Sequence, residues 1–146
     1  MKNICFFSKI LILYFLTTFV VFGSESKYFN DGKKLFLKND LEGSKYFFEK
    51  DIVFNPKSEM SYLYLAKIFE NKENEVSEEL NLNTVLMLNP KNEEAIYMLM
   101  QLRIKQSNFS EVEELIEKFK LICTSICSKV KDIENKLDNL STNNSD

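Results

Sequence analysis

Two cysteines near the carboxyl end are the residues best suited to chemistry. Cys123 and Cys127 are four positions apart, on a predicted helix or across its end. The chain has no histidine and only one other cysteine, Cys5, so a closed four-ligand metal site within one chain is not expected. Three interpretations remain open: buried structural thiols, a disulfide at a broken helix, and a metal or redox pair. A regular helix does not present this spacing in good disulfide geometry, which favours buried thiols.

Acidic residues are frequent, and paired carboxylates could perform acid–base chemistry if they were buried at a fixed separation. The pairs lie instead at predicted helix starts and on helix faces. Glu113 and Glu117, like Glu114 and Lys118, have the spacing of solvent-exposed neighbours. The absence of histidine removes the commonest general base, and no glycine-rich phosphate loop is present. The sequence therefore predicts neither an enzyme nor a bound metal or cofactor.

The composition indicates one ordered, helical domain. The 146 residues are 45% hydrophobic and 28% charged, with only three Gly and two Pro. Thirteen Phe and six Tyr are enough to fill the seams between several helices. The formal net charge of −3 and the lack of a basic stripe argue against a nucleic-acid partner.

The first 23 residues are typical of an export signal. Lys2 and Lys9 give it a positive start, residues 10–22 carry no charge, and the segment ends in Gly23. We expect cleavage between Gly23 and Ser24, which leaves 17 basic and 22 acidic residues and a net charge of −5.

A retained membrane anchor is the alternative for this segment. The uncharged run of thirteen residues is short for a span of about 20 residues. It lengthens if it is counted back to Ile4, with Lys9 placed at the membrane interface. No cysteine follows the run within the segment, which counts against a lipid anchor.

The rest of the chain is organised by a 34-residue period. Asn55-Pro56 recurs as Asn89-Pro90, and Pro56 and Pro90 are the only prolines of the chain. Because proline cannot continue a helix and disfavours the α conformation in the residue before it, each pair ends a helix. Polar turns such as Asn39-Asp40 divide the intervals, with Asp40, Ser58 and Asn92 expected as N-caps. The pattern predicts helices that include 27–37, 59–70, 75–88 and 128–140.

This arrangement resembles the tetratricopeptide repeat family, whose repeat length is 34 residues. The places of the family signature in the first helices hold Tyr28, Gly32 and Leu35, then Tyr62, Leu65, Ala66 and Phe69, then Ile96, Leu99, Met100 and Arg103. In the second helices Asp51 and Glu78 stand where a small residue is usual. At Glu78 we expect a shifted or distorted turn.

The resemblance implies an all-α fold, an α-α superhelix of helical hairpin repeats. The repeats would cover about 25–57, 58–91 and 92–124 within residues 24–124. Residues 125–140 would form a capping helix with a wet outer face, and residues 141–146 a disordered polar tail.

Tetratricopeptide arrays bind extended peptides or helices in a groove lined by the first helix of each repeat. By this resemblance Lys33, Lys67 and Gln101, spaced by 34, form a ladder along the groove floor. Two lysines among apolar anchors suit an amphipathic or weakly acidic segment. The alternative is that these side chains pack internally or against the C-terminal helix. The full expected set is Phe29, Lys33, Phe36, Leu63, Lys67, Glu70, Tyr97, Gln101 and Ile104.

The sequence thus predicts a non-enzymatic adaptor or scaffold that holds another protein. We expect it to be exported, periplasmic or attached to the cell envelope. It would touch the membrane only through a retained N-terminal segment. A small repeat protein in that setting resembles the accessory subunits of outer-membrane barrel-assembly machinery, which suggests a role in envelope or outer-membrane protein assembly. The alternative is a structural protein that self-associates into homo-oligomers through its grooves or its C-terminal helix.

Overall fold

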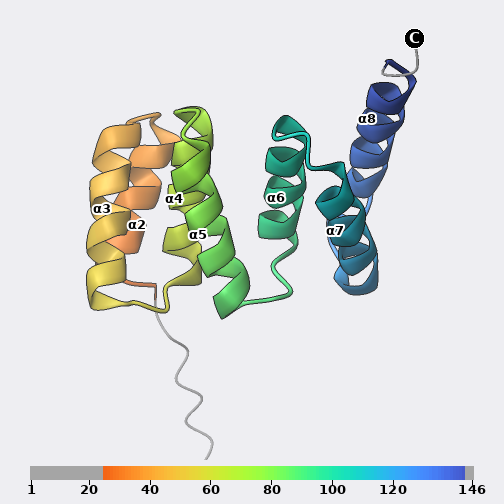
Figure 1. Ribbon diagram of the computed structural model, residues 1–146. Helices are drawn as coiled ribbons and strands as arrows, with labels where there is room; N and C mark the ends of the chain where they lie inside the picture. Colours follow the sequence, from red (N-terminus) through yellow and green to blue (C-terminus); the bar gives the residue numbers. More distant parts are fainter. Residues whose placement is uncertain (1–24, 144–146) are drawn as a thin grey trace, which may run out of the picture.

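Seven helices make up residues 25–143, the part of the chain that the computed structural model describes, and no strand lies among them. The helices are α2 (Lys27–Leu37), α3 (Leu41–Phe54), α4 (Glu59–Asn71), α5 (Glu75–Leu88), α6 (Glu93–Lys105), α7 (Phe109–Ile122) and α8 (Lys129–Asn143). Two hairpins, α2–α3 and α4–α5, stand side by side at one end, α6 follows, and α7 and α8 form the other end (Figure 1). The predicted all-α hairpin-repeat fold is confirmed.

The predicted export signal, residues 1–23, lies outside the described residues. Between residues 25 and 143, no helix has the length and apolar character needed to cross a membrane.

Each hairpin turns on one residue in the left-handed backbone region. Asn39, Glu73 and Ser107, spaced by 34, have φ values of 61°, 53° and 57°. In each turn the following N–H donates to a carbonyl five residues back, which closes the end of the first helix. These closing bonds are Asp40 to Leu35 (3.0 Å), Asn74 to Phe69 (3.0 Å) and Asn108 to Arg103 (2.9 Å).

The residue after each left-handed position caps the second helix. The side chains of Asp40 and Asn74 accept the N–H groups of Gly43 (2.9 Å) and Ser77 (3.1 Å). The predicted caps Asp40 and Asn92 are confirmed, since Asn92 accepts the Ala95 N–H at 2.8 Å. Ser58 occupies the predicted N-cap position of α4, but without a side-chain cap bond. Its hydroxyl donates to the Ser61 hydroxyl at 3.0 Å.

Small residues let the two helices of a hairpin approach closely. A Cβ atom added to Gly32 of α2 would lie 3.0 Å from the Phe48 ring of α3. The hydroxyl of Ser44 donates to the Gly32 carbonyl at 2.9 Å. Ala66 takes the same place in α4 and is fully buried. Side chains larger than these would push the paired helices apart.

Asp51 is buried at a position where the family signature has a small residue. Its carboxylate accepts hydrogen bonds from the hydroxyls of Ser26 and Ser61 and from the Asn55 amide. Burial raises the pKa of Asp51, but hydrogen bonds led by that of Ser26 outweigh it, so the pKa lies below its ordinary value. Asp51 therefore joins the start of α2, the end of α3 and the start of α4.

Glu78 of α5 is a second buried acid at a position where the family signature has a small residue. The predicted distortion is wrong, because α5 runs without interruption from Glu75 to Leu88. The Glu78 side chain is only 1% exposed, and its Oε2 atom has no hydrogen-bond partner. Burial raises the pKa of Glu78 to about 7, although Lys105 acts in the opposite direction. A protonated carboxyl is thus favoured up to near-neutral pH.

Arg103 stands where the signature has an aromatic residue, and its buried guanidinium joins three helices. Its Nη2 atom lies 2.7 Å from Glu79 of α5, and its Nε atom lies 2.6 Å from Glu111 of α7. Since Glu79 belongs to the second repeat and Arg103 and Glu111 to the third, these ion pairs link the two repeats.

The turns between repeats share another pattern, and the last one carries a disulfide. Asn55, Asn89 and Cys123, again spaced by 34, each donate their N–H to a carbonyl four residues back. Helix α7 ends at Ile122, and Cys123 is bonded to Cys127 in the following loop. The favoured interpretation as buried thiols is wrong, because the helix ends here and Cys127 is exposed.

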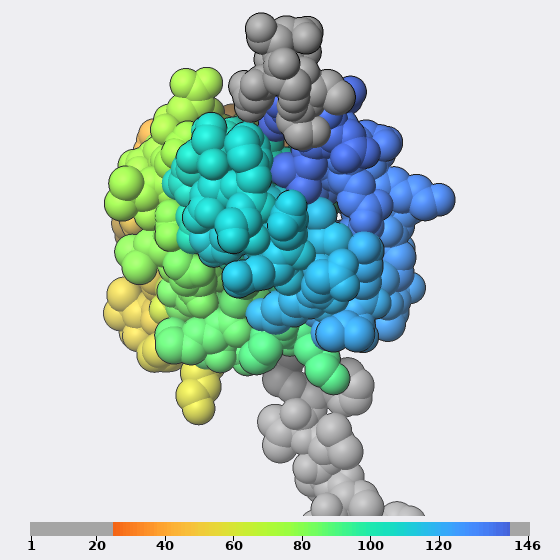
Figure 2. Space-filling view, turned by 45° about the vertical axis from the view of Figure 1, so that its right-hand side comes forward, coloured from red at the N-terminus to blue at the C-terminus, as the bar shows by residue number. Residues whose placement is uncertain are grey.

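Helix α8 closes the C-terminal end of the stack. Val130 and Ile133 are buried in the core cluster that contains α6 and α7 side chains. Its opposite side is exposed, as expected for a capping helix. Figure 2 shows α7 and α8 together at the end that faces the viewer. Because α8 extends to Asn143, residues 141–143 are helical and do not belong to a disordered tail.

Replacing Ala66 with Leu should overfill the α4–α5 hairpin and lower the free energy of unfolding by about 1–3 kcal/mol. Urea denaturation followed by circular dichroism would measure this. The matched control is Asn83→Leu, at an exposed position of α5, which should change stability by less than about 0.5 kcal/mol. Equal stability of Ala66→Leu and wild type would contradict the tight packing of this hairpin.

Stability should decrease as the pH rises through the titration of Glu78. Its folded pKa of about 7 exceeds the ordinary 4.5, so the folded state binds more protons between these pH values. The free energy of unfolding should therefore fall from pH 4.5 to 7, by up to about 3 kcal/mol. The free energy of unfolding, measured by thermal unfolding at several pH values, should not decrease in this way for Glu78→Gln. The variant Glu114→Gln, at an exposed site, should keep the decrease. Parallel profiles for all three proteins would exclude Glu78 as the cause.

Candidate binding groove

A hollow of about 260 Å³ lies between the first helices of the repeats and the start of α8. We call this hollow and its lining the groove. Helices α4 and α6 supply most of it, α2 contributes one aromatic ring, and α8 contributes one lysine. The lining residues are Phe36, Lys67, Glu70, Asn71, Glu94, Tyr97, Met98, Gln101 and Lys129.

Helical periodicity explains why these side chains share one wall. On α4 the lining positions are separated by three and four residues, and on α6 by three, four and seven. Residues at these intervals lie on the same face of an α-helix. Because α4 and α6 are the first helices of successive hairpins, their faces lie next to each other across the hollow.

One ion pair crosses the groove. The Lys67 Nζ atom of α4 lies 2.9 Å from a Glu94 carboxylate oxygen of α6, and it also lies 4.9 Å from the centre of the Tyr64 ring. The Lys67 side chain is 23% exposed and the Glu94 side chain 48%. A pair this accessible contributes about 0–1 kcal/mol, so a ligand carboxylate could compete with Glu94 for Lys67.

Tyr97 and Lys129 form the end of the groove. The Lys129 Nζ atom stands 4.6 Å from the centre of the Tyr97 ring, a cation–π contact. Burial raises the pKa of the Tyr97 hydroxyl, and the charges of Asp132 and Glu70 add to this effect. The hydroxyl therefore stays protonated near neutral pH and can donate a hydrogen bond.

Five of the nine predicted groove residues line the hollow: Phe36, Lys67, Glu70, Tyr97 and Gln101. Phe29 and Leu63 do not, because both are buried in the core. Lys33 and Ile104 are half-buried and lie outside the lining. The predicted three-member ladder is therefore reduced here to Lys67 and Gln101.

The two buried residues share a register with Tyr97, which explains the error. Phe29 packs edge-on against Tyr64 of the next first helix, with ring centres 5.7 Å apart. Leu63 is likewise buried in the core cluster that contains α6 side chains. Tyr97 is followed instead by α8, which covers it with Lys129. The same position is therefore core where another repeat follows and groove surface in the last repeat.

Four lining residues were not predicted: Asn71, Glu94, Met98 and Lys129. Glu94 lies seven residues before Gln101, on the same helical face, and this spacing could have identified it. Lys129 has no such signal, because the disulfide loop breaks the 34-residue register ahead of it.

A larger hollow, about 630 Å³, lies at the other end of the molecule between the start of α2 and the α3–α4 turn. Asp51 is the buried acid in its lining, but its carboxylate is engaged by several donors. Hydrogen-bonded in this way and with a lowered pKa, it is a poor general base. Among the described residues, no cluster of three or more His, Cys, Asp or Glu side chains could hold a metal ion.

No protein-family model and no curated protein matches this sequence. Solved structures do match. The first tetratricopeptide domain of Spaghetti (RPAP3), bound to the HSP90 peptide SRMEEVD, has a TM-score of 0.69 at 13% identity over 78% of this chain and 93% of that one. The Sgt2 domain from Aspergillus fumigatus gives 0.68 at 13% identity, over 82% and 81%.

The CopN–Scc3 complex also matches, with a TM-score of 0.63 at 18% identity over 77% of this chain and 66% of that chain. At these identities the likeness concerns the fold. The chain has the all-α, tetratricopeptide-like solenoid fold of these domains.

Proposed function

We propose that the protein is a non-enzymatic adaptor that binds a peptide or helix of another protein in the groove. The observation that carries this proposal is the convergence of groove side chains from α2, α4, α6 and α8 on one open hollow. One of the similar structures is bound to an HSP90 peptide, and another is a complex of two proteins. Both support a protein ligand.

The groove chemistry favours an amphipathic or weakly acidic segment. Lys67 and Lys129 supply positive charge, while Phe36 and Tyr97 supply aromatic surface. A ligand carboxylate can pair with Lys67 in place of Glu94, and a ligand side chain can pack against the aromatic rings. A strongly acidic ligand is less suited, because Glu70 and Glu94 also line the hollow.

We further propose that the protein works outside the cytosol, exported to the periplasm or cell envelope, in envelope or outer-membrane protein assembly. The charged and apolar pattern of the first 23 residues supports export. The Cys123–Cys127 disulfide supports it independently, since disulfides persist mainly in oxidising compartments.

Lys67→Glu should weaken partner binding by about tenfold, because it places a second acid beside Glu94. The measurement is capture of the partner in cells by a photo-crosslinking residue at Gln101, followed by mass spectrometry. The free energy of unfolding should change by less than about 1 kcal/mol, since only a partly exposed pair is lost.

Lys118→Glu, at an exposed position of α7, is the charge-matched control and should leave capture unchanged. A crosslinker at position 118 should not capture the partner either. Equal capture of the partner from positions 101 and 118 would exclude the adaptor function. So would crosslinks from position 101 that reach only other copies of this same protein.

A second candidate function is structural self-association, and a separate surface favours it. Val53, Met87 and Leu121 are spaced by 34 residues on the second helices α3, α5 and α7, and they are 73%, 75% and 87% exposed. Large apolar side chains repeated in register on a surface are a common feature of interfaces. A second copy of the chain could cover them.

If self-association is the function, Met87→Glu should abolish it, because the mutation places a charge at the centre of this apolar row. Sedimentation velocity at increasing protein concentration would show oligomers for wild type and monomers for the variant. Asn83→Glu, one turn earlier on α5, is the control. A wild-type protein that remains monomeric at high concentration would exclude this second function.

A further inference from the structure

The disulfide lies in a turn that differs from the other turns between repeats. Cys123 stands 34 residues after Asn89, so the disulfide loop, residues 123–127, takes the place that Asn-Pro occupies twice before. The Cα atoms of Cys123 and Cys127 are 5.4 Å apart. Cys127 is exposed and Cys123 is half-buried, so a reductant in solution can reach the bond.

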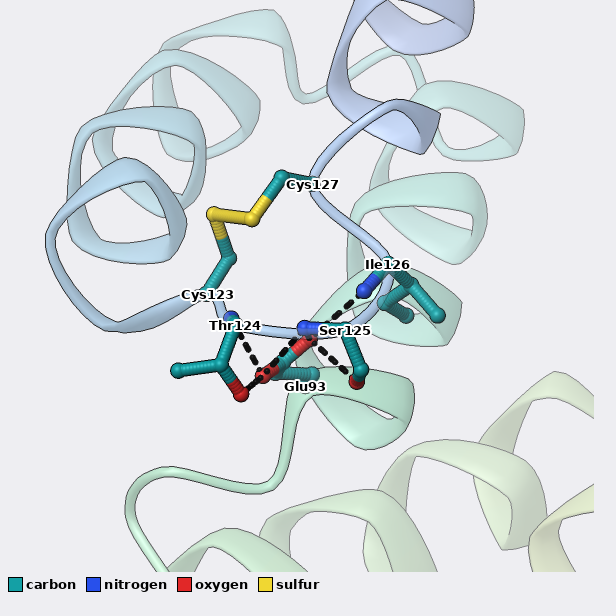
Figure 3. Close-up of a disulfide and its surroundings, with 6 residues drawn as sticks. All are labelled: Glu93, Cys123, Thr124, Ser125, Ile126 and Cys127. Carbon is teal, nitrogen blue, oxygen red and sulfur yellow. Dashed lines mark hydrogen bonds between the residues drawn. A yellow bond between two sulfur atoms is a disulfide. The ribbon is translucent and has the colours of Figure 1, made fainter.

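The loop is wrapped around one carboxylate from another helix. Glu93, the first residue of α6, accepts hydrogen bonds from the N–H groups of Thr124 (2.7 Å), Ser125 (3.1 Å) and Ile126 (2.9 Å) (Figure 3). The hydroxyls of Thr124 and Ser125 donate to it at 2.7 and 2.9 Å. Hydrogen bonds led by that of the Ile126 N–H lower the pKa of Glu93 to about 2. The carboxylate thus fixes the course of the loop.

Glu93 has a counterpart one repeat earlier, which indicates what the contact does. Glu59, 34 residues before it, accepts hydrogen bonds from Asn89 (2.9 Å) and Asn92 (2.5 Å) in the next turn. In both places a carboxylate at the start of a first helix holds the turn that leads to the following helix. At Asn89-Pro90 the proline restricts the turn, whereas in the loop 123–127, which has no proline, the disulfide closes a ring.

The loop leads directly into the last wall of the groove. Lys129 begins α8 two residues after Cys127, and its N–H donates to the Ile126 carbonyl at 3.0 Å. Its ammonium group lies over the Tyr97 ring and lines the groove. The loop residue Ile126, whose own N–H is bound by Glu93, is thus hydrogen-bonded to the residue that begins α8.

We propose that the Cys123–Cys127 disulfide is a reducible latch that holds Lys129 at the groove, so that partner binding depends on the redox state of this bond. The binding part of this proposal rests on the proposed adaptor function. With the bond intact, the closed ring holds the three amides around Glu93. With the bond broken, the ring opens, the amides separate from Glu93, and Lys129 leaves Tyr97.

The reductant is a dithiol, either a small molecule or a dithiol oxidoreductase. Its thiolate attacks the exposed Cys127 sulfur and forms a mixed disulfide, while Cys123 leaves as a thiolate and takes up a proton. The second thiol of the reductant, as its thiolate, then attacks the reductant's own sulfur and releases Cys127, which is also protonated. Two electrons and two protons pass to the protein, and the reductant becomes a disulfide.

Hydrogen exchange of the full chain, followed by mass spectrometry with and without dithiothreitol, tests the latch directly. Reduction should speed exchange of the amides at 124–126 and in the first turn of α8 by about tenfold or more. Amides of α4 and α5 should not change. Unchanged protection at 124–126 after complete reduction would overturn the proposal.

Three variants separate the latch from other effects. Cys123→Ser with Cys127→Ser should exchange quickly in this segment without reductant and should no longer respond to it. Cys5→Ser keeps the disulfide and should respond as wild type does. Glu93→Gln keeps the cysteines but removes the charge that the loop amides bind, so this segment should exchange faster in the oxidised protein. Wild-type protection in Glu93→Gln would show that the carboxylate does not hold the loop.

The binding arm uses photo-crosslinking from Gln101 in oxidised and reduced protein. Reduction should lower the partner yield by about tenfold, and the double serine variant should show the low yield in both conditions. Faster exchange with an unchanged yield would overturn the coupling to binding while leaving the adaptor function intact. If no partner is captured in either state, the adaptor function fails, and the coupling fails with it, whatever the exchange result.

Discussion

The fold depends on a left-handed residue placed between the two helices of every hairpin. Asn39, Glu73 and Ser107 each lie in a three-residue connection that reverses the chain. None is glycine, so each turn must hold a less favourable backbone conformation. The hydrogen bonds that close the first helix and cap the second stabilise that conformation. Because the turn is so short, the two helices must pack directly on each other. The fixed hairpins then present their first helices side by side.

What the sequence predicted well was local. Helix bounds and most caps follow from neighbouring residues, such as Asn92 and the Ala95 amide that it caps. What it predicted poorly depended on residues far apart in the chain. Asp51 is stabilised by Ser26 and Ser61, on other helices, and periodicity does not reveal such partners. Glu78 was expected to distort α5, but a buried carboxyl can remain protonated instead, and the helix stays regular.

The groove was predicted in part for a related reason. Family geometry gives the right face of each first helix, but whether a residue on that face is covered depends on the helix that packs next to it. Phe29 and Leu63 are covered by later helices, whereas Tyr97 is covered by Lys129. The position of Lys129 depends on the disulfide loop, which no 34-residue pattern describes. The part of the groove formed by Lys129 could therefore not be predicted from the repeat pattern.

The same loop connects the two proposals about location and binding. In a reducing cytosol a solvent-accessible pair such as Cys123 and Cys127 is kept as free thiols, and in an oxidising compartment it forms the disulfide. If the chain is exported as we propose, the latch closes only after export. Glu93 and the amides around it then bring Lys129 to the groove. A groove completed in this way would be fully formed where its partner is encountered and incomplete during synthesis. This would limit premature binding without any additional domain.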